Sequence, residues 1–201
     1  MIHDLDSTIA TLLAHELPTD LAAQVAISFA TPDDQFPPMA VTLPAIDLFL
    51  YDVRENRELR SNEWLVERRS DGTATRQRAP ARVDCSYLIT AWASENSPNR
   101  AQDEHRLLGE VMRVLLRFPT LPAAVLQGTL AGQEPLLPTS VLQPGRLQSV
   151  GEFWQALGGK PKAALNYTVT ISVIIQEPEL TGPPVIDQRL RIQEGVIGEG
   201  P

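Results

Sequence analysis

Three stretches of the chain alternate apolar and polar residues, and this period of two predicts half-buried strands. The first covers residues 24–30, the second residues 81–94 and the third residues 165–176. Their apolar faces are Val25, Ile27 and Phe29, then Val83, Cys85, Tyr87, Ile89 and Ala91, then Tyr167, Val169, Ile171, Val173 and Ile175. A further strand is expected over residues 41–53. Pro44 cannot donate to a ladder, which places the first part of that segment at an edge or a bend.

Apolar residues at helical spacing predict helices between these strands. The strongest covers residues 102–118 and ends before Pro119; its stripe is Leu107, Leu108, Val111, Leu115 and Phe118. A first helix is expected to be capped by Asp6 or Ser7 and to end by residue 17, ahead of Pro18. Residues 121–131 suggest another short helix. A last one is expected after the cap Ser149, with Gly158 and Gly159 beyond its end.

Residues 64–78 have the pattern of a hairpin, because extended residues flank Asp71-Gly72. This dipeptide favours a turn with positive φ at both central positions. Few apolar residues lie on either arm, so we expect a charged hairpin that projects from the body of the protein.

Strands and helices do not alternate regularly along the chain, and no glycine-rich turn leads from a strand to a helix. The order predicts an α+β fold with a mostly antiparallel sheet packed against a few helices. We expect one domain over residues 1–176. Residues 177–201, rich in Pro and Gly, are expected to form a tail or an arm, in which "VIDQRLRIQ" is an additional candidate strand.

The overall charge limits the classes of partner. A formal net charge of −8 and a pI near 4.9 argue against general nucleic-acid binding, which needs a basic surface. No apolar run is long enough to span a membrane, and the acidic N-terminus does not resemble a secretory signal. Cys85 is the only cysteine, which excludes an internal disulfide and fits a cytoplasmic protein.

The charge is unevenly distributed. Residues 1–50 contain seven acidic residues and no Lys or Arg, whereas residues 52–82 contain eight of the 17 basic residues, all arginine, against six acidic ones. A mixed-charge segment is often only a solubilising surface. The alternative is a docking surface, because arginine forms bidentate contacts with carboxylates and is enriched at interfaces. An acidic body with a basic projection is also complementary to copies of itself, as a ring requires.

Candidate chemistry is sparse. "ALGGKPK" fails as a phosphate loop at two positions, and a helix end followed by a turn explains it better. The three histidines lie far apart in sequence, and Cys85 falls on an apolar strand face, as a core residue does. We therefore expect no catalytic residue, no metal and no cofactor. Trp92, on the polar side of its strand, is a candidate for an interface or a second layer.

Four segments, taken in order, resemble the tail-terminator (cap) proteins of extracellular contractile injection systems of the antifeeding-prophage type. The first is a Leu-Tyr strand followed by an Asn/Arg turn, within "LFLYDVRENRELRSNEW". The second is a Tyr-Leu-x-Thr-x-Trp-Ala strand, and the third an acidic/His-x-Leu-Leu-Gly helix that ends at Pro. The fourth is a Trp-x-x-Leu helix followed by a Tyr-x-Val strand. The matching residues are Leu50, Tyr51, Asn56, Leu59, Arg60; Tyr87, Leu88, Thr90, Trp92, Ala93; Glu104, His105, Leu107, Leu108, Gly109, Pro119; and Trp154, Leu157, Tyr167, Val169.

The resemblance covers residues 5–176 and implies a phage-tail-like structural protein that is not an enzyme. Such proteins form a hexameric ring that ends the inner tube and anchors the sheath at the distal end. The implied partners are further copies of the chain, the inner tube protein and the sheath protein, without nucleic acid or membrane. The expected contact residues are Arg54, Arg57, Arg60, Arg68, Arg69 and Trp92. The alternatives are an adaptor or regulatory domain that binds one protein, and a small hydrolase.

Overall fold

The computed structural model describes residues 1–70, 72–133, 136–143 and 150–181. The chain forms two compact units, one made of Met1–Arg60 and Pro80–Val173, the other of Ser61–Ala79 and the residues from Ile174 onward. The expected division between residues 176 and 177 stays a prediction, and the candidate strand at residues 185–193 lies outside the described residues.

The first unit is built on a five-stranded sheet with the order β1-β2-β5-β7-β6. Its strands are β1 (Ala26–Ser28), β2 (Ala45–Glu55), β5 (Ala81–Trp92), β6 (Thr139–Val141) and β7 (Ala164–Val173). Only the short β1–β2 pair is parallel, and the other pairs are antiparallel. The expected α+β class is confirmed. β2 begins directly after Pro44, so the segment before it does not join the strand.

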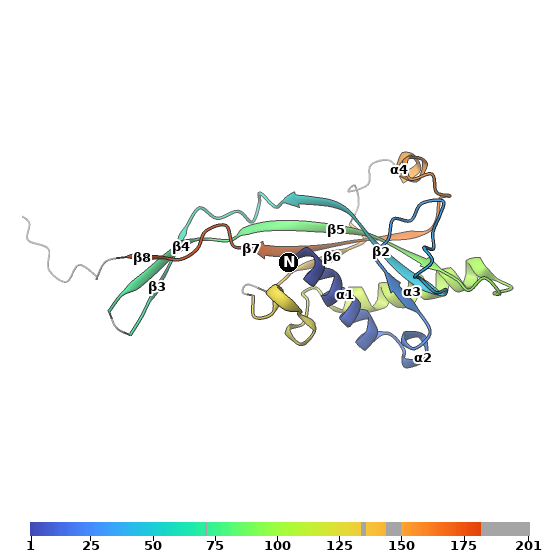
Figure 1. The fold of residues 1–201 in the computed structure, drawn as a ribbon, viewed down its shortest axis with the longest axis horizontal. Coiled ribbons are helices and arrows are strands. Elements are labelled where there is room, and N and C mark those ends of the chain that lie inside the picture. Colours follow the sequence, from blue (N-terminus) through green and yellow to red (C-terminus); the bar gives the residue numbers. More distant parts are fainter. Residues whose placement is uncertain (71, 134–135, 144–149, 182–201) are drawn as a thin grey trace, which may run out of the picture. The chain divides into compact units, whose positions relative to one another are not determined.

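One face of this sheet carries the hydrophobic core. Cys85, Tyr87 and Ile89 of β5 are buried there beside Tyr167 and Val169 of β7. Helices α1 (Ile2–Glu16) and α3 (Arg100–Arg117) cover this face, as Figure 1 shows. They contribute Leu5, Ile9, Leu12, Leu13, Leu107, Leu108, Val111, Val114 and Leu115. Each fully buried Leu or Ile contributes roughly 2 kcal/mol to stability, so the amphipathic stripes of the helices and the apolar strand faces stabilise each other.

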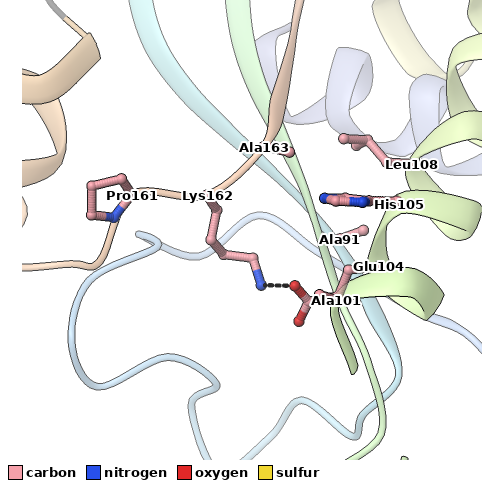
Figure 2. A pocket seen from close by; sticks show the side chains of 8 residues that line it. All are labelled: Ala91, Ala101, Glu104, His105, Leu108, Pro161, Lys162 and Ala163. Atoms are coloured by element: carbon pink, nitrogen blue, oxygen red, sulfur yellow. Dashed lines mark ion pairs between the residues drawn. The ribbon is translucent and has the colours of Figure 1, made fainter. Parts of the chain in front are cut away.

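The opposite face carries aromatic residues at one end. Helix α4 (Val150–Ala156) lies on this side, and Phe153 packs against Phe49 and Tyr51 with ring centroids 6.3 and 6.0 Å apart. Trp92 stacks on Phe36 at 4.2 Å. Lys162 reaches the same corner and pairs with Glu104 of α3 at 2.7 Å (Figure 2). Gly158 has φ +69° just beyond α4, which confirms the helix end expected in "ALGGKPK", while the expected cap Ser149 lies outside the described residues.

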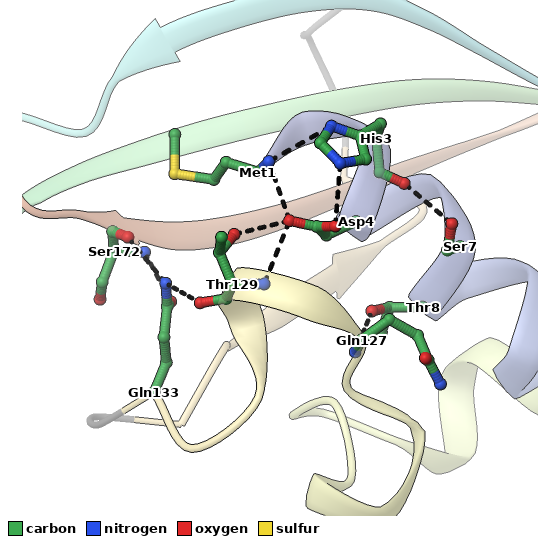
Figure 3. Close-up of polar contacts among 9 residues, drawn as sticks. All are labelled: Met1, His3, Asp4, Ser7, Thr8, Gln127, Thr129, Gln133 and Ser172. Carbon is green, nitrogen blue, oxygen red and sulfur yellow. Dashed lines mark hydrogen bonds and ion pairs between the residues drawn. The ribbon is translucent and has the colours of Figure 1, made fainter.

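Helix α1 begins earlier than the sequence predicts. Its N-cap is Met1, whose amine pairs with Asp4 at 2.9 Å. Asp4 also accepts hydrogen bonds from the backbone N–H and the hydroxyl of Thr129, at 3.1 and 2.6 Å (Figure 3). The expected caps have other partners. Asp6 accepts a hydrogen bond from the Tyr87 hydroxyl, and the Ser7 hydroxyl donates to the His3 carbonyl. The cap prediction was wrong because the helix start is fixed by partners more than a hundred residues away.

The remaining elements of this unit are short. Helix α2 (Thr19–Ala22) follows Pro18. The helix expected over residues 121–131 is instead two 3₁₀ turns, η1 (Ala123–Val125) and η2 (Gly128–Leu130). Beside them, the Gln133 side-chain amide donates to the Ser172 carbonyl and accepts from the Ser172 N–H (Figure 3). It thereby occupies the position of a peptide group beside β7.

The second unit contains a three-stranded antiparallel sheet with the order β3-β4-β8. Strands β3 (Trp64–Arg68) and β4 (Ala74–Arg78) form the expected charged hairpin, and β8 (Glu179–Thr181) pairs with β4. The Arg69 N–H still bonds the Thr73 carbonyl, so the loop covers residues 70–72 rather than two residues. Gly72 supplies the positive φ of +83° that this longer loop requires, whereas the φ expected at Asp71 lies outside the described residues.

Replacement of Gly128 by alanine is predicted to destabilise the fold. Gly128 has φ +54°, and an added Cβ would lie 2.2 Å from Asp4 Oδ1, so the methyl group both strains the backbone and displaces Asp4 from Thr129. The backbone strain alone costs about 1–3 kcal/mol. Denaturant unfolding measures the change. Gly109→Ala is the control: it lies inside α3 with open space around its Cβ and should stabilise by about 0.5–1 kcal/mol. Equal effects of the two variants would contradict this account.

Asp47 predicts a pH dependence of stability. It is fully buried; Oδ1 accepts the Ala30 N–H at 3.1 Å, and Oδ2 has no partner among the described residues. Burial raises the pKa of Asp47 to about 7. In the unfolded chain this carboxyl titrates at about pH 4. Protonated Asp47 therefore contributes fully to the free energy of unfolding below about pH 4; this contribution declines as the pH rises to about 7 and is absent above it. Asp47→Asn should therefore gain stability relative to the parent by roughly 2–4 kcal/mol between pH 4 and 8. A pH-independent difference in unfolding midpoints would show that Asp47 ionises freely.

Candidate protein-contact surfaces

Three of the expected contact residues lie at the exposed end of β2 and in the loop after it. Arg54 Nε pairs with Asp52 at 2.6 Å, yet 65% of its side chain remains exposed. Arg60 pairs with Glu55 at 3.1 Å and is exposed to a similar degree, and Arg57 is also exposed. Exposed ion pairs contribute little stability, so these guanidinium groups can exchange an internal carboxylate for one on a partner.

Asn56 fixes the start of this loop. Its N–H donates to the Arg82 carbonyl at 2.8 Å, and its Nδ2 donates to Asp84 at 3.1 Å. Its Oδ1 accepts the Leu59 N–H at 3.1 Å. The three bonds join the end of β2 to β5 and bend the chain directly afterwards. The Asn/Arg turn of the resemblance thus has a physical basis, since Asn56 sets the backbone that presents Arg57 and Arg60.

The Asp84 side chain that accepts from Asn56 belongs to a buried polar network. Asp84 also accepts from the Thr170 hydroxyl at 2.7 Å, and Arg82 donates to Ser172. Burial lowers the pKa of Arg82, although a guanidinium stays charged at any physiological pH. The count of arginines over residues 52–82 did not separate buried from exposed side chains, and Arg82 is buried. The alternation of β5 predicts only that residues 82 and 84 share the face opposite Cys85.

Arg68 and Arg69 belong to the second unit. Both are exposed; Arg68 is the last residue of β3, and Arg69 follows it directly before the hairpin loop. On β4, Arg76 and Arg78 hold their guanidinium carbons 4.8 and 5.0 Å from the ring centroid of Trp64. Cation–π contacts of this kind favour the position of the Trp64 ring beside the two arginines of β4. Of the expected arginines, Arg54, Arg57 and Arg60 therefore belong to the first unit, and Arg68 and Arg69 belong to the second.

Trp92 lies at the corner where several motif segments meet. Its indole N–H donates to Thr90 at 2.9 Å, and Lys162 Nζ sits 4.0 Å from its ring centroid. Because Phe36 stacks on the ring at a similar distance, the lysine occupies the other face. The ring is half-buried between the two, and its part in an interface stays a prediction.

A small cavity of about 200 Å³ lies beside this corner (Figure 2). It is lined by Ala91, Ala101, Glu104, His105, Leu108, Pro161, Lys162 and Ala163. Its lysine and carboxylate neutralise each other, and Glu104 also accepts the Ala93 N–H at 3.4 Å. These groups therefore tie α3 to the end of β5 and to the segment before β7, which is a structural role.

The remaining candidate chemical groups have structural surroundings as well. Cys85 is buried in the core, and burial raises the pKa of its thiol to about 11, far from the reactive thiolate form. In the part of the chain that the structure describes, no group of three or more His, Cys, Asp or Glu residues lies together as metal ligands would. None of the helices described combines the length and apolar character that a membrane span requires.

Comparison with solved structures finds five similar chains, among them two terminators. The sheath/tube terminator of an extracellular contractile injection system (PVC), in its extended state, has 25% identity and a TM-score of 0.70; the match covers 99% of this chain and 65% of that one. The tube-terminating cap of the anti-feeding prophage has 26% identity and a TM-score of 0.65, over 94% of this chain and 60% of that one. This chain thus spans less than two thirds of the length of either relative.

These matches confirm the resemblance to the tail-terminator family that the order of segments indicated. Comparison with curated protein sequences finds no match. The family model described as the Pvc16 N-terminal domain matches residues 4–188, which is nearly the whole sequence. The chain therefore belongs to the Pvc16 N-terminal domain family.

Proposed function

We propose that this chain is a structural cap that ends the inner tube of a contractile injection system and anchors the sheath at its distal end. The observation that carries the proposal is the fold match to two terminators over 94–99% of the chain. Six copies form a closed ring, assembled in the cytoplasm as part of a phage-tail-like particle. Its partners are the inner tube protein, the sheath protein and its own copies; it needs no cofactor and catalyses no reaction.

The proposed contact residues are Arg54, Arg57, Arg60, Arg68, Arg69 and Trp92. A cap that meets two different polymers and its own copies needs several separate surfaces, and the arginines lie on two units. Asn56 holds Arg57 and Arg60 in a fixed loop, which lowers the conformational entropy lost on docking. Guanidinium groups on such a loop match carboxylates on a partner.

Deletion of the gene is predicted to leave particles without a defined distal end. Electron microscopy of the deletion strain should show tubes and sheaths of variable length or separated from each other, because neither polymer is terminated. Re-expression of the chain should restore uniform lengths. Particles of normal length with intact ends in the deletion strain would rule out the cap function.

Charge reversal at Arg54, Arg57 and Arg60 together is predicted to abolish attachment to particles while the purified protein stays folded. All three side chains are exposed, so the exchange leaves the core intact. Co-sedimentation with particles measures attachment, and circular dichroism measures folding. The matched control reverses Arg100, Arg106 and Arg113, three exposed arginines of α3, and should still co-sediment. Attachment at the parental level by the first variant would show that this end of β2 is only a solubilising surface.

A further inference from the structure

Strand β3 is an open edge of the second unit's sheet. It pairs with β4 on one side, and no described strand pairs with the other. All five of its residues are exposed, including Trp64, Leu65 and Val66. Its register with β4 has no bulge, and its sequence has no Pro or Lys, which are among the features that protect an edge; its charged residues are Glu67 and Arg68. An edge of this kind is a template for a strand from another chain.

The hydrogen bonds at both ends of the hairpin show which backbone groups face outward. The Glu63 carbonyl accepts the Ala79 N–H, and the Arg69 N–H donates to the Thr73 carbonyl. Antiparallel bonding alternates along a strand, so residues 65 and 67 also face β4. The N–H and C=O groups of Trp64, Val66 and Arg68 therefore point to the open side, spaced to bond an incoming strand.

A second open edge lies on the first unit. β1 pairs with β2 only at Ala45–Asp47, and beyond Asp47 no described strand pairs with that side of β2. The Asn56 N–H donates to the Arg82 carbonyl of β5, and backbone hydrogen bonding alternates from residue to residue along an antiparallel strand. The backbone N–H and C=O of Arg54 therefore also point toward β5, whereas those of Val53 and Glu55 point to the open side. Val53 is 47% exposed. The side chains of β2 change from buried at Ala45 to exposed at Val53, Arg54 and Glu55.

The two edges complement each other. A ring of identical subunits needs a heterologous contact, in which two different surfaces of the chain meet. The outward residues of β3 combine an exposed valine with a basic residue, Val66 and Arg68; those of β2 combine an exposed valine with an acidic one, Val53 and Glu55. Edge-to-edge pairing would bury the apolar side chains and bring opposite charges together, while the backbone bonds supply affinity.

We propose that β3 of one copy pairs with the open edge of β2 in the next copy, and that this repeated strand addition closes the ring. The inference rests on the proposed cap function, because it names the subunit contact of that ring. It makes the hairpin a subunit connector, and it gives Arg68 and Glu55 a shared role in orienting the pair.

Cross-linking tests the contact directly. Purified particles carrying Val53→Cys and Val66→Cys in the same chain are treated with a short bis-maleimide; Cys85 is buried and does not interfere. The double variant should give a ladder of linked products up to the ring size on a denaturing gel. Mixed rings of the two single variants should give dimers, and neither single variant should cross-link alone.

Two results would overturn the proposal. Dimers from Val66→Cys alone would mean that two β3 edges meet, which is an isologous contact. Absence of linked products in the double variant, on particles that retain the protein and have normal ends, would show that the edges do not meet. In that case the cap function survives, because it is judged by particle length and not by cross-links.

Proline substitution provides an independent test through the backbone. Val66→Pro removes an outward N–H without touching a β3–β4 bond, so the purified protein should keep its unfolding temperature and lose attachment to particle ends. Val66→Ala keeps the N–H and should retain attachment. Glu67→Pro is the folding control, because it breaks an internal bond and should lower the unfolding temperature. Normal attachment of a folded Val66→Pro protein would contradict the proposed pairing.

Discussion

The pairing of β5 with β2 on one side and β7 on the other is the constraint on which the rest of the first unit depends. β5 is twelve residues long and is bonded along both edges, so its register fixes which side chains of three strands share a face. A shift by one residue would exchange Cys85 and Tyr87 for Asp84 and Ser86 in the core. Helices α1 and α3, the aromatic corner and the Asn56 loop all take their positions from this register.

The sequence predicts those elements whose information is local. Alternation found the long strands, and helical spacing found α3 within two residues at its start and one at its end. Helical spacing also found α1 and its end, but the start of α1 was missed, because the carboxylate that organises its first turn binds Thr129, 125 residues away. The charge count along the sequence took no account of burial. Asp4 and Asp47 are buried, so the acidic first quarter of the chain has less negative surface than its composition suggests. Strand faces were predictable, but the network from Asn56 to Asp84 and Thr170 needed the register between strands.

The candidate contact surfaces were also predictable only where they depend on local sequence. Arg54, Arg57 and Arg60 were predictable as a dense polar segment after a buried strand, but the support that Asn56 gives their loop was not. The charge window over residues 52–82 also crosses from one compact unit to the other, so its arginines are divided between the two units. Two surfaces with open strand edges suit a subunit that binds neighbours on both sides, whereas the small cavity beside Glu104 holds charges that are already paired. The account of a cap therefore explains features that a catalytic reading leaves without a role.

Cryo-electron microscopy of purified particles, focused on their distal ends, tests the central claim most directly. The account predicts a sixfold ring into which six copies of this fold can be built, in contact with the last layer of the tube and with the end of the sheath. Intact particle ends at which another protein forms the terminal ring, with this chain elsewhere or missing, would contradict it.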